Sequence, residues 1–148
     1  MFQRILVPID GSQTAFRALD VAIELAKQQN ALLRVVEVVD LGPLYRASTS
    51  GVNIAEIEKA MLQSCQSDLN QATARATRAG VNLETSLIEG SGRRISNDIV
   101  DEAQRWKADL IVIGTHGRHG LQRLVLGSVA EGVARTAPAP VLLVRGGG

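Results

Sequence analysis

The chain has 148 residues, of which 45% are apolar and 21% are charged, and its formal net charge is +1. This length and composition are typical of an ordinary globular protein, so we expect residues 1–148 to form a single domain with its own core. The nearly balanced charge gives no reason to expect binding to nucleic acid or to an acidic membrane surface.

The single cysteine, Cys65, excludes an intramolecular disulfide and a zinc site built from cysteines. No apolar run reaches the ~20 residues that a membrane-spanning helix needs. The first residues, MFQRILVPID, lack the pattern of a secretory signal. We therefore expect a cytoplasmic protein with no membrane partner.

The first half of the chain alternates between strand and helix patterns. Residues 4–9 are a predicted strand, and Ser12 is a candidate N-cap for a helix whose apolar stripe runs from Ala15 to Ala26. Residues 32–39 are the second predicted strand. Residues 40–53 are rich in Gly, Pro, Ser and Thr, so we expect a loop there.

The same alternation continues to the end of the chain. A long helix with apolar residues from Ile54 to Ala76 is expected to end at Gly80, and residues 82–89 form an alternating strand that is typical of a sheet edge. A third helix, with apolar residues from Ile95 to Trp106, precedes a strand at 109–114. The last helix begins near Val129, and a strand at 140–145 follows it.

The order of these elements predicts the fold class. Strict β-α alternation indicates a parallel sheet with right-handed crossovers and helices on both faces, a doubly wound α/β domain. In such sheets, ligands bind beyond the carboxyl ends of the strands, where the strand order reverses.

A glycine-rich stretch, GTHGRHGLQRLVLGS, runs from Gly114 to Ser128 between a predicted buried strand and the last helix. Glycines let backbone N–H groups approach an anion closely, and the start of a helix attracts negative charge. Ser128 offers a hydroxyl that could cap the helix or contact a phosphate. The alternative is that the glycines only shape a turn, and their number and position favour an anion site.

Two common phosphate motifs are absent. The stretch has no lysine before Ser128, so it is not a Walker A loop, and the turn after the first strand, PIDGSQTA, has too few glycines for a dinucleotide fingerprint.

Other candidate residues have structural interpretations as well. Asp10 could be a turn residue or a ligand contact, and it could also help to hold Mg²⁺. His116 and His119 lack the acidic neighbours expected of a metal site, and no dedicated metal site is predicted. Cys65 lies on the apolar face of its predicted helix, which favours a core position.

The spacing G-x2-G-x9-G-S, formed by Gly114, Gly117, Gly127 and Ser128, resembles the nucleotide-binding signature of the universal stress protein family. Three longer segments also resemble that family and occur in the same order: ILVPIDGS, DLIVIGTHGRHGL and LGSVAEGVARTAPAPVLLV. The resemblance implies a five-stranded parallel sheet in the order 3-2-1-4-5. It also implies the ATP-binding branch of the family, with ATP bound between the first and fourth strands.

The resemblance further implies a role for each matching residue. Backbone groups of the glycine signature and of the last helix would contact the phosphates, the end of the fourth strand and Asp10 would contact the ribose, and Val38 would contact adenine. Position 130 is often Ser or Thr in the family but is Ala here, so only a backbone contact is carried over. The nucleotide-binding residues expected in this way are Pro8, Ile9, Asp10, Val38, Ile113, Gly114, His116, Gly117, Gly127, Ser128, Val129 and Ala130.

The last predicted strand suggests a second partner. An exposed apolar edge strand is prone to pairing, and the family resemblance implies a homodimer through this strand. The expected interface residues are Val141, Leu142, Leu143 and Val144.

Together these features favour a regulatory protein of the stress response that holds ATP, with Mg²⁺, over an enzyme. No general base is evident beside the expected γ-phosphate. The alternative is a slow ATPase or nucleotide hydrolase of the same fold.

Overall fold

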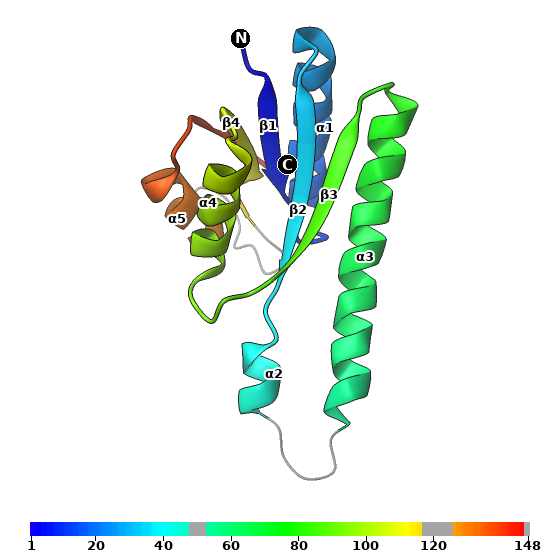
Figure 1. The fold of residues 1–148 in the computed structure, drawn as a ribbon, viewed down its shortest axis with the longest axis vertical. Helices are drawn as coiled ribbons and strands as arrows, with labels where there is room; N and C mark the ends of the chain where they lie inside the picture. Colours follow the sequence, from blue (N-terminus) through cyan, green and yellow to red (C-terminus); the bar gives the residue numbers. More distant parts are fainter. Residues whose placement is uncertain (48–52, 117–125, 147–148) are drawn as a thin grey trace.

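The computed structural model describes residues 1–47, 53–116 and 126–146. Strands and helices alternate along this part of the chain, as the sequence predicts (Figure 1). The strand ends differ from the predicted ones by no more than one residue. The elements are β1 (Arg4–Pro8), α1 (Gln13–Gln29), β2 (Leu32–Val39), α2 (Gly42–Arg46), α3 (Ile54–Arg78), β3 (Leu83–Glu89), α4 (Ile95–Trp106), β4 (Leu110–Gly114), α5 (Ser128–Thr136) and β5 (Val141–Val144).

The strands form one five-stranded sheet in the order β3-β2-β1-β4-β5, and every pair is parallel. The predicted α/β fold and strand order are therefore confirmed. β1 lies in the middle, with Pro8 opposite Val36 of β2 and Leu6 opposite Ile111 of β4. β3 and β5 are the two edges, and β3 has the half-exposed pattern that its alternating sequence predicts.

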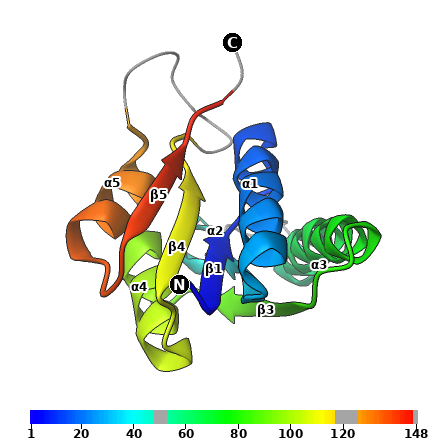
Figure 2. The same cartoon turned by 90° about the horizontal axis from the view of Figure 1, so that it is seen from above.

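Helices cover both faces of the sheet. α1 and α3 lie on one face and α4 and α5 on the other, as the view in Figure 2 shows. Two apolar clusters correspond to these layers: one contains Leu19 of α1 and Leu69 of α3, and the other contains Ile99 of α4 and Val133 of α5. With only 3% aromatic residues, both layers depend on close packing of aliphatic side chains.

The helix ends carry the signals that the sequence predicts. The Ser12 side chain accepts a hydrogen bond from Ala15 N–H at 3.1 Å and caps α1. α3 is followed by Gly80 in a left-handed conformation, with φ of +74°, which allows Val81 N–H to donate to Ala76 O. Local sequence therefore defines where these helices start and stop.

The expectation of a loop throughout residues 40–53 is wrong in one part, because Gly42–Arg46 forms the short helix α2. Pro43 lies in its first turn, where proline is well tolerated because no intrahelical donor is needed. The buried Leu41 and the neighbouring Leu44 pack against α3, so tertiary contacts stabilise a segment whose composition is typical of a loop.

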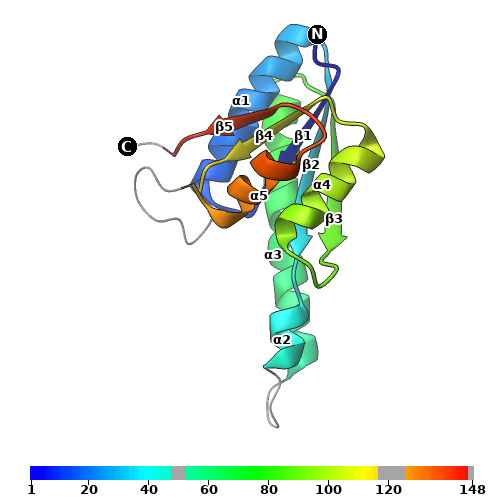
Figure 3. The same cartoon turned by 90° about the vertical axis from the view of Figure 1, so that its left-hand side faces the viewer.

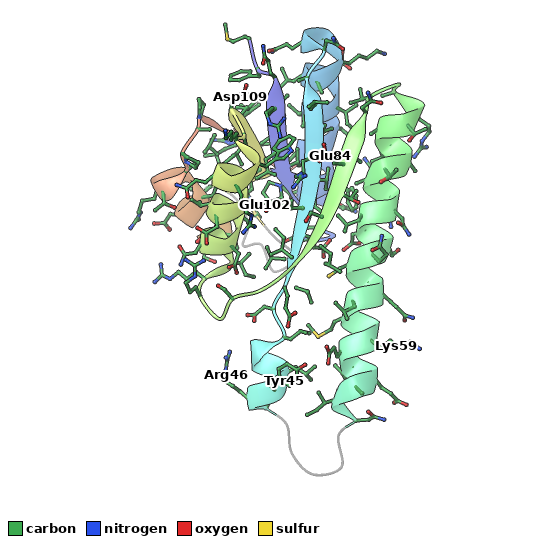
Figure 4. The ribbon with its side chains drawn as sticks, in the orientation of Figure 1. Tyr45, Arg46, Lys59, Glu84, Glu102 and Asp109 are labelled. Carbon is green, nitrogen blue, oxygen red and sulfur yellow. The ribbon has the colours of Figure 1, made fainter. Side chains whose placement is uncertain are left out.

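α2 and the adjoining half of α3 extend beyond the sheet as a projecting arm (Figures 1 and 3). Tyr45 of α2 donates a hydrogen bond to Glu58 of α3 at 2.9 Å, and Figure 4 shows Tyr45 between the two helices. A small apolar cluster with Val39, Leu41 and Cys65 at its centre lies at the base of this arm, and Leu87 of β3 packs against both it and the larger α1–α3 cluster. The buried position of Cys65 agrees with the core role predicted for it.

At the opposite end of the sheet, Arg34 links β2 to the two elements beside it. Its guanidinium donates to Glu84 of β3 and to Glu102 of α4, each at 2.6 Å (the two acidic residues are labelled in Figure 4). Burial tends to lower the pKa of Arg34, but the hydrogen bonds with the two carboxylates outweigh it and hold the pKa above its usual value. Glu102 is only 5% exposed and also accepts from Arg105, so its charge is well compensated.

Across residues 1–47, 53–116 and 126–146, no helix combines the length and the hydropathy needed to cross a membrane.

The Arg34 network yields a stability prediction. Arg34→Met should lower the free energy of unfolding by about 1–3 kcal/mol, because the buried Glu102 loses one of its charged partners. Glu84→Gln, at the half-exposed end of the same network, should change it by less than about 0.5 kcal/mol. Urea unfolding of both variants measures the difference. If both variants lowered the free energy of unfolding equally, the hydrogen bond from Arg34 to the buried Glu102 would not be the dominant one.

Candidate functional site

The described residues expected to bind nucleotide lie at the carboxyl edge of the sheet or at the start of α5. Because all five strands are parallel, Asp10 after β1, His116 after β4 and Val38 near the end of β2 reach the same edge. The strand order reverses between β1 and β4, since β1 connects to β2 on one side while β4 lies on its other side. This reversal is where a doubly wound sheet binds ligands.

A tight turn follows β1. Ile9 N–H donates to Val36 O at 2.8 Å, which extends the pairing with β2, and its side chain is buried. Asp10 then accepts a hydrogen bond from Ser12 N–H through Oδ1 at 3.0 Å, and Gly11 between them has a φ of +82°. Asp10 therefore has the turn role that its sequence allowed. The half-buried Asp10 also lies at the reversal, where a ligand contact is compatible with the turn.

The end of β4 fits closely against the start of α1. A Cβ atom at Gly114 would lie 2.8 Å from Thr14 Cγ2 and 3.1 Å from the Thr14 backbone carbonyl carbon and oxygen. A Cβ atom at Gly146, beyond β5, would lie 2.9 Å from Thr14 Oγ1. The first signature glycine thus has a structural role here, because it allows α1 to approach the sheet beside the candidate site.

Thr115 joins three parts of the site. Its N–H donates to Val144 O of β5 at 2.9 Å, and its carbonyl accepts from Gly127 N–H at 2.7 Å. Its Oγ1 lies 2.8 Å from Nδ1 of His116. The residue as a whole is only 8% exposed. No sequence motif indicated Thr115, since its role depends on contacts with residues distant in the chain.

The bond from Gly127 to Thr115 holds the N-terminus of α5 at the end of β4. Gly127 is the N-cap of α5 and Ser128 is its first residue, with no side-chain cap, so the capping role considered for Ser128 is wrong. The first N–H groups of a helix have no acceptor within the helix and attract anions. α5 packs closely against α4 at Gly132. A Cβ atom there would lie 2.3 Å from Ser96 Oγ of α4, so the contact needs a residue without a side chain.

Several expected residues share the apolar cluster on the α4–α5 face. Ile113 and Ala130 are buried in it, and Val38 and Val129 pack against it partly exposed. The structure thus brings the expected adenine contact to the same face as the start of α5. Gly117 lies outside the described residues, as do Arg118, His119 and Arg123.

The charged residues of the β3–α4 turn compensate one another. Arg93 pairs with Asp101 and approaches Asp98, and it is half exposed. The hydrogen bond to Asp101, and then the charge of Asp101, raise the pKa of Arg93 above its usual value and outweigh the opposing effect of burial. We therefore assign Arg93 to this surface network and not to the candidate site.

Comparison with known proteins agrees with this geometry. The sequence model of the Universal stress protein family matches residues 1–145 of the chain. The chain belongs to the universal stress protein family. It is 37% identical over 145 residues to Universal stress protein MJ0531 of Methanocaldococcus jannaschii, a match that covers 98% of this chain and 83% of the relative.

Solved structures of the family share the fold of this universal stress protein. A family member from Burkholderia pseudomallei is 36% identical, with a TM-score of 0.78 over 97% of this chain and 96% of that one. Two further structures contain nucleotides. A universal stress protein in complex with cAMP is 29% identical, with a TM-score of 0.69 and 97% of each chain covered. The universal stress protein of Archaeoglobus fulgidus in complex with dAMP is 27% identical. Its TM-score is 0.68, and the match covers 97% of this chain and 98% of that one.

The contact between Gly114 and Thr14 yields a second stability prediction. Gly114→Ala should lower the free energy of unfolding of this universal stress protein by about 1–3 kcal/mol, because the added methyl overlaps the start of α1. Thr14→Ser in the same chain should restore only part of the loss, since it removes Cγ2 but leaves the backbone contacts. Urea unfolding measures both values. If Thr14→Ser restored the full wild-type stability, the added methyl would conflict with Thr14 Cγ2 alone and not with the backbone of α1.

Proposed function

We propose that this universal stress protein belongs to the ATP-binding branch of its family and acts as a nucleotide-dependent regulatory protein of the stress response. The observation that carries the proposal is the 2.7 Å bond from Gly127 N–H to Thr115 O. It holds a helix N-terminus at the end of β4, at the strand-order reversal where β1 also ends. The complexes of two relatives with adenine nucleotides support the same ligand class.

In this proposal each part of the nucleotide meets a different part of the edge. The phosphates lie at the start of α5, and the ribose lies against Asp10 and the end of β4. Adenine lies near Val38, with Pro8 and Ile9 lining the pocket. The proposed phosphate contacts are Gly117, His116, Gly127 and the backbone N–H groups of Ser128, Val129 and Ala130, and the proposed ribose contacts also include Ile113 and Gly114. The N–H of Gly127 itself donates to Thr115 O, so Gly127 would contribute its lack of a side chain and not a hydrogen bond.

Mg²⁺ would accompany the triphosphate. It commonly binds phosphate oxygens together with one or two carboxylates, and Asp10 is a carboxylate at the reversal. Asp10 is thus compatible with a shared role, in which one oxygen holds the turn through Ser12 N–H. The ion would neutralise phosphate charge that backbone N–H groups alone balance only in part.

Backbone donors favour holding ATP over cleaving it. They stabilise phosphate charge but cannot accept the proton of an attacking water, as a general base does. A slow ATPase is therefore the alternative. Product formation above the solvent rate, abolished by the binding-site variant described next, would support that alternative.

The binding prediction uses a double variant. Gly127→Val with Ser128→Ala should abolish stabilisation by ATP and Mg²⁺, because the added side chain obstructs the helix N-terminus and the hydroxyl is lost. The wild-type protein should gain about 2.7 kcal/mol at a ligand concentration 100 times the dissociation constant, measured by thermal unfolding.

The matched control is Thr136→Ala, which removes a hydroxyl at the other end of the same helix. It should leave the ATP-dependent stabilisation unchanged. Parallel titrations with ADP, AMP, cAMP and dAMP rank the nucleotides. Absence of any shift with the wild-type protein at millimolar ATP would contradict the proposed function.

We also propose a homodimer through β5. This strand pairs with β4 on one side, and Leu142 and Leu143 are 39% and 38% exposed. Antiparallel pairing of β5 with a second copy would cover the apolar edge that Val141, Leu142, Leu143 and Val144 form.

Leu143→Asp should shift the protein from dimer to monomer, because two charges would face each other at the paired edge. Leu32→Asp is the matched control, since Leu32 is 42% exposed and lies on β2, away from β5. Light scattering coupled to size-exclusion chromatography measures the mass of both. A dimeric Leu143→Asp variant would place the interface elsewhere.

A further inference from the structure

Thr115 is held in place by its backbone on both sides. Its N–H donates to Val144 O at 2.9 Å and its carbonyl accepts from Gly127 N–H at 2.7 Å. These bonds anchor it to β5 and to the start of α5, so the position of its side chain is well determined. The residue is also buried, with 8% of its surface exposed.

The hydroxyl of this anchored residue meets a titratable ring at the site. Thr115 Oγ1 lies 2.8 Å from Nδ1 of His116, a distance typical of a hydrogen bond. His116 is half-buried and directly precedes residues 117–125, which lie outside the described part of the chain. The contact fixes one nitrogen of the ring and leaves Nε2 as the other polar atom.

Two arrangements fit this distance. Either the hydroxyl donates to an unprotonated Nδ1, or a protonated Nδ1–H donates to the hydroxyl oxygen. In neutral histidine one nitrogen is a donor and the other an acceptor, so the first arrangement makes Nε2 a donor and the second makes it an acceptor. Only the first allows a neutral His116 to donate a hydrogen bond to an anion.

We propose that Thr115 is a positioning residue whose hydroxyl donates to Nδ1 of His116 and so presents Nε2–H to a phosphate of the bound nucleotide. The identity of that phosphate rests on the proposed function, whereas the hydrogen bond between the two side chains is a property of the free protein. The phosphate site then gains a neutral side-chain donor beside the backbone donors at the start of α5, without a proton having to be taken up.

The first test measures the tautomer of His116 in the free protein. Long-range ¹⁵N NMR distinguishes a protonated Nε2 from a protonated Nδ1, and His116→Gln assigns the signal because the chain has two histidines. We expect Nε2–H in the wild-type protein and in Thr115→Ser, which keeps the hydroxyl. Thr115→Val keeps the shape and both backbone bonds, and it should give a mixture of tautomers.

The second test measures the affinity for ATP by calorimetry. His116→Gln should bind about tenfold more weakly, the size expected for one lost hydrogen bond to a charged group. Thr115→Val should bind about two- to threefold more weakly, because only the fraction of a tautomer mixture that carries Nε2–H can donate, and Thr115→Ser should bind as the wild type does. The double variant of Thr115→Val with His116→Gln should lose no more than His116→Gln alone, because Thr115 acts through His116.

The outcomes separate this inference from the proposed function. A wild-type ring protonated at Nδ1, or additive losses in the double variant, would overturn the positioning role even if ATP binds well. A wild-type protein with the expected tautomer that binds no nucleotide would overturn the proposed function and the phosphate contact together. Unfolding curves for the Val and Ser variants show whether any loss of affinity reflects a loss of stability.

Discussion

Parallel pairing of β1 between β2 and β4 is the constraint on which the other features depend. It requires every strand to end at the same edge, and it requires the chain to cross over the sheet in opposite directions on the two sides of β1. The α1 crossover covers one face on the way to β2, while β4 is reached later from the other side. The carboxyl ends of β1 and β4 therefore lie beside each other with no crossover between them. The site residues are functional candidates because of this topology, before any side chain is considered.

Close packing then gives this edge its precision. Glycines stand at points where helices approach strands or each other: Gly114 against Thr14 of α1, and Gly132 of α5 against Ser96 of α4. The core is mainly aliphatic, with one buried aromatic residue in each main cluster, Phe16 and Trp106, and small residues at the contacts let the layers pack closely. As a result, the start of α5 is held by two constraints, the sideways contact with α4 and the hydrogen bond from Gly127 to Thr115. A helix N-terminus fixed in this way is pre-organised to receive an anion.

Most of the fold could be predicted from the sequence because its signals are local. Apolar runs marked the strands, the stripe from Ala15 to Ala26 marked α1, and Ser12 and Gly80 marked helix ends with recognisable capping chemistry. The order of the strands came from the family resemblance, since pairing is not a local property. α2 was missed because Gly and Pro suit both a loop and the first turn of a helix, and packing on α3 decides between them. Thr115 was missed because its role arises from β5, α5 and His116 together, which no spacing along the chain reveals.

The projecting arm of α2 and half of α3 has a consequence for the cooperativity of the molecule. Its apolar contacts form a small cluster around Leu41 and Cys65 that meets the α1–α3 core at Leu87, and the bond from Tyr45 to Glu58 joins its two helices. Opening the arm would therefore expose little of the two main cores, and it would leave β1, β4 and α5 in place. Segments of this kind form units of local unfolding with lower free energies than the central strands. The backbone amides of α2 would accordingly exchange with solvent hydrogen faster than those of β1. The carboxyl edge of the sheet would keep its structure during this local opening.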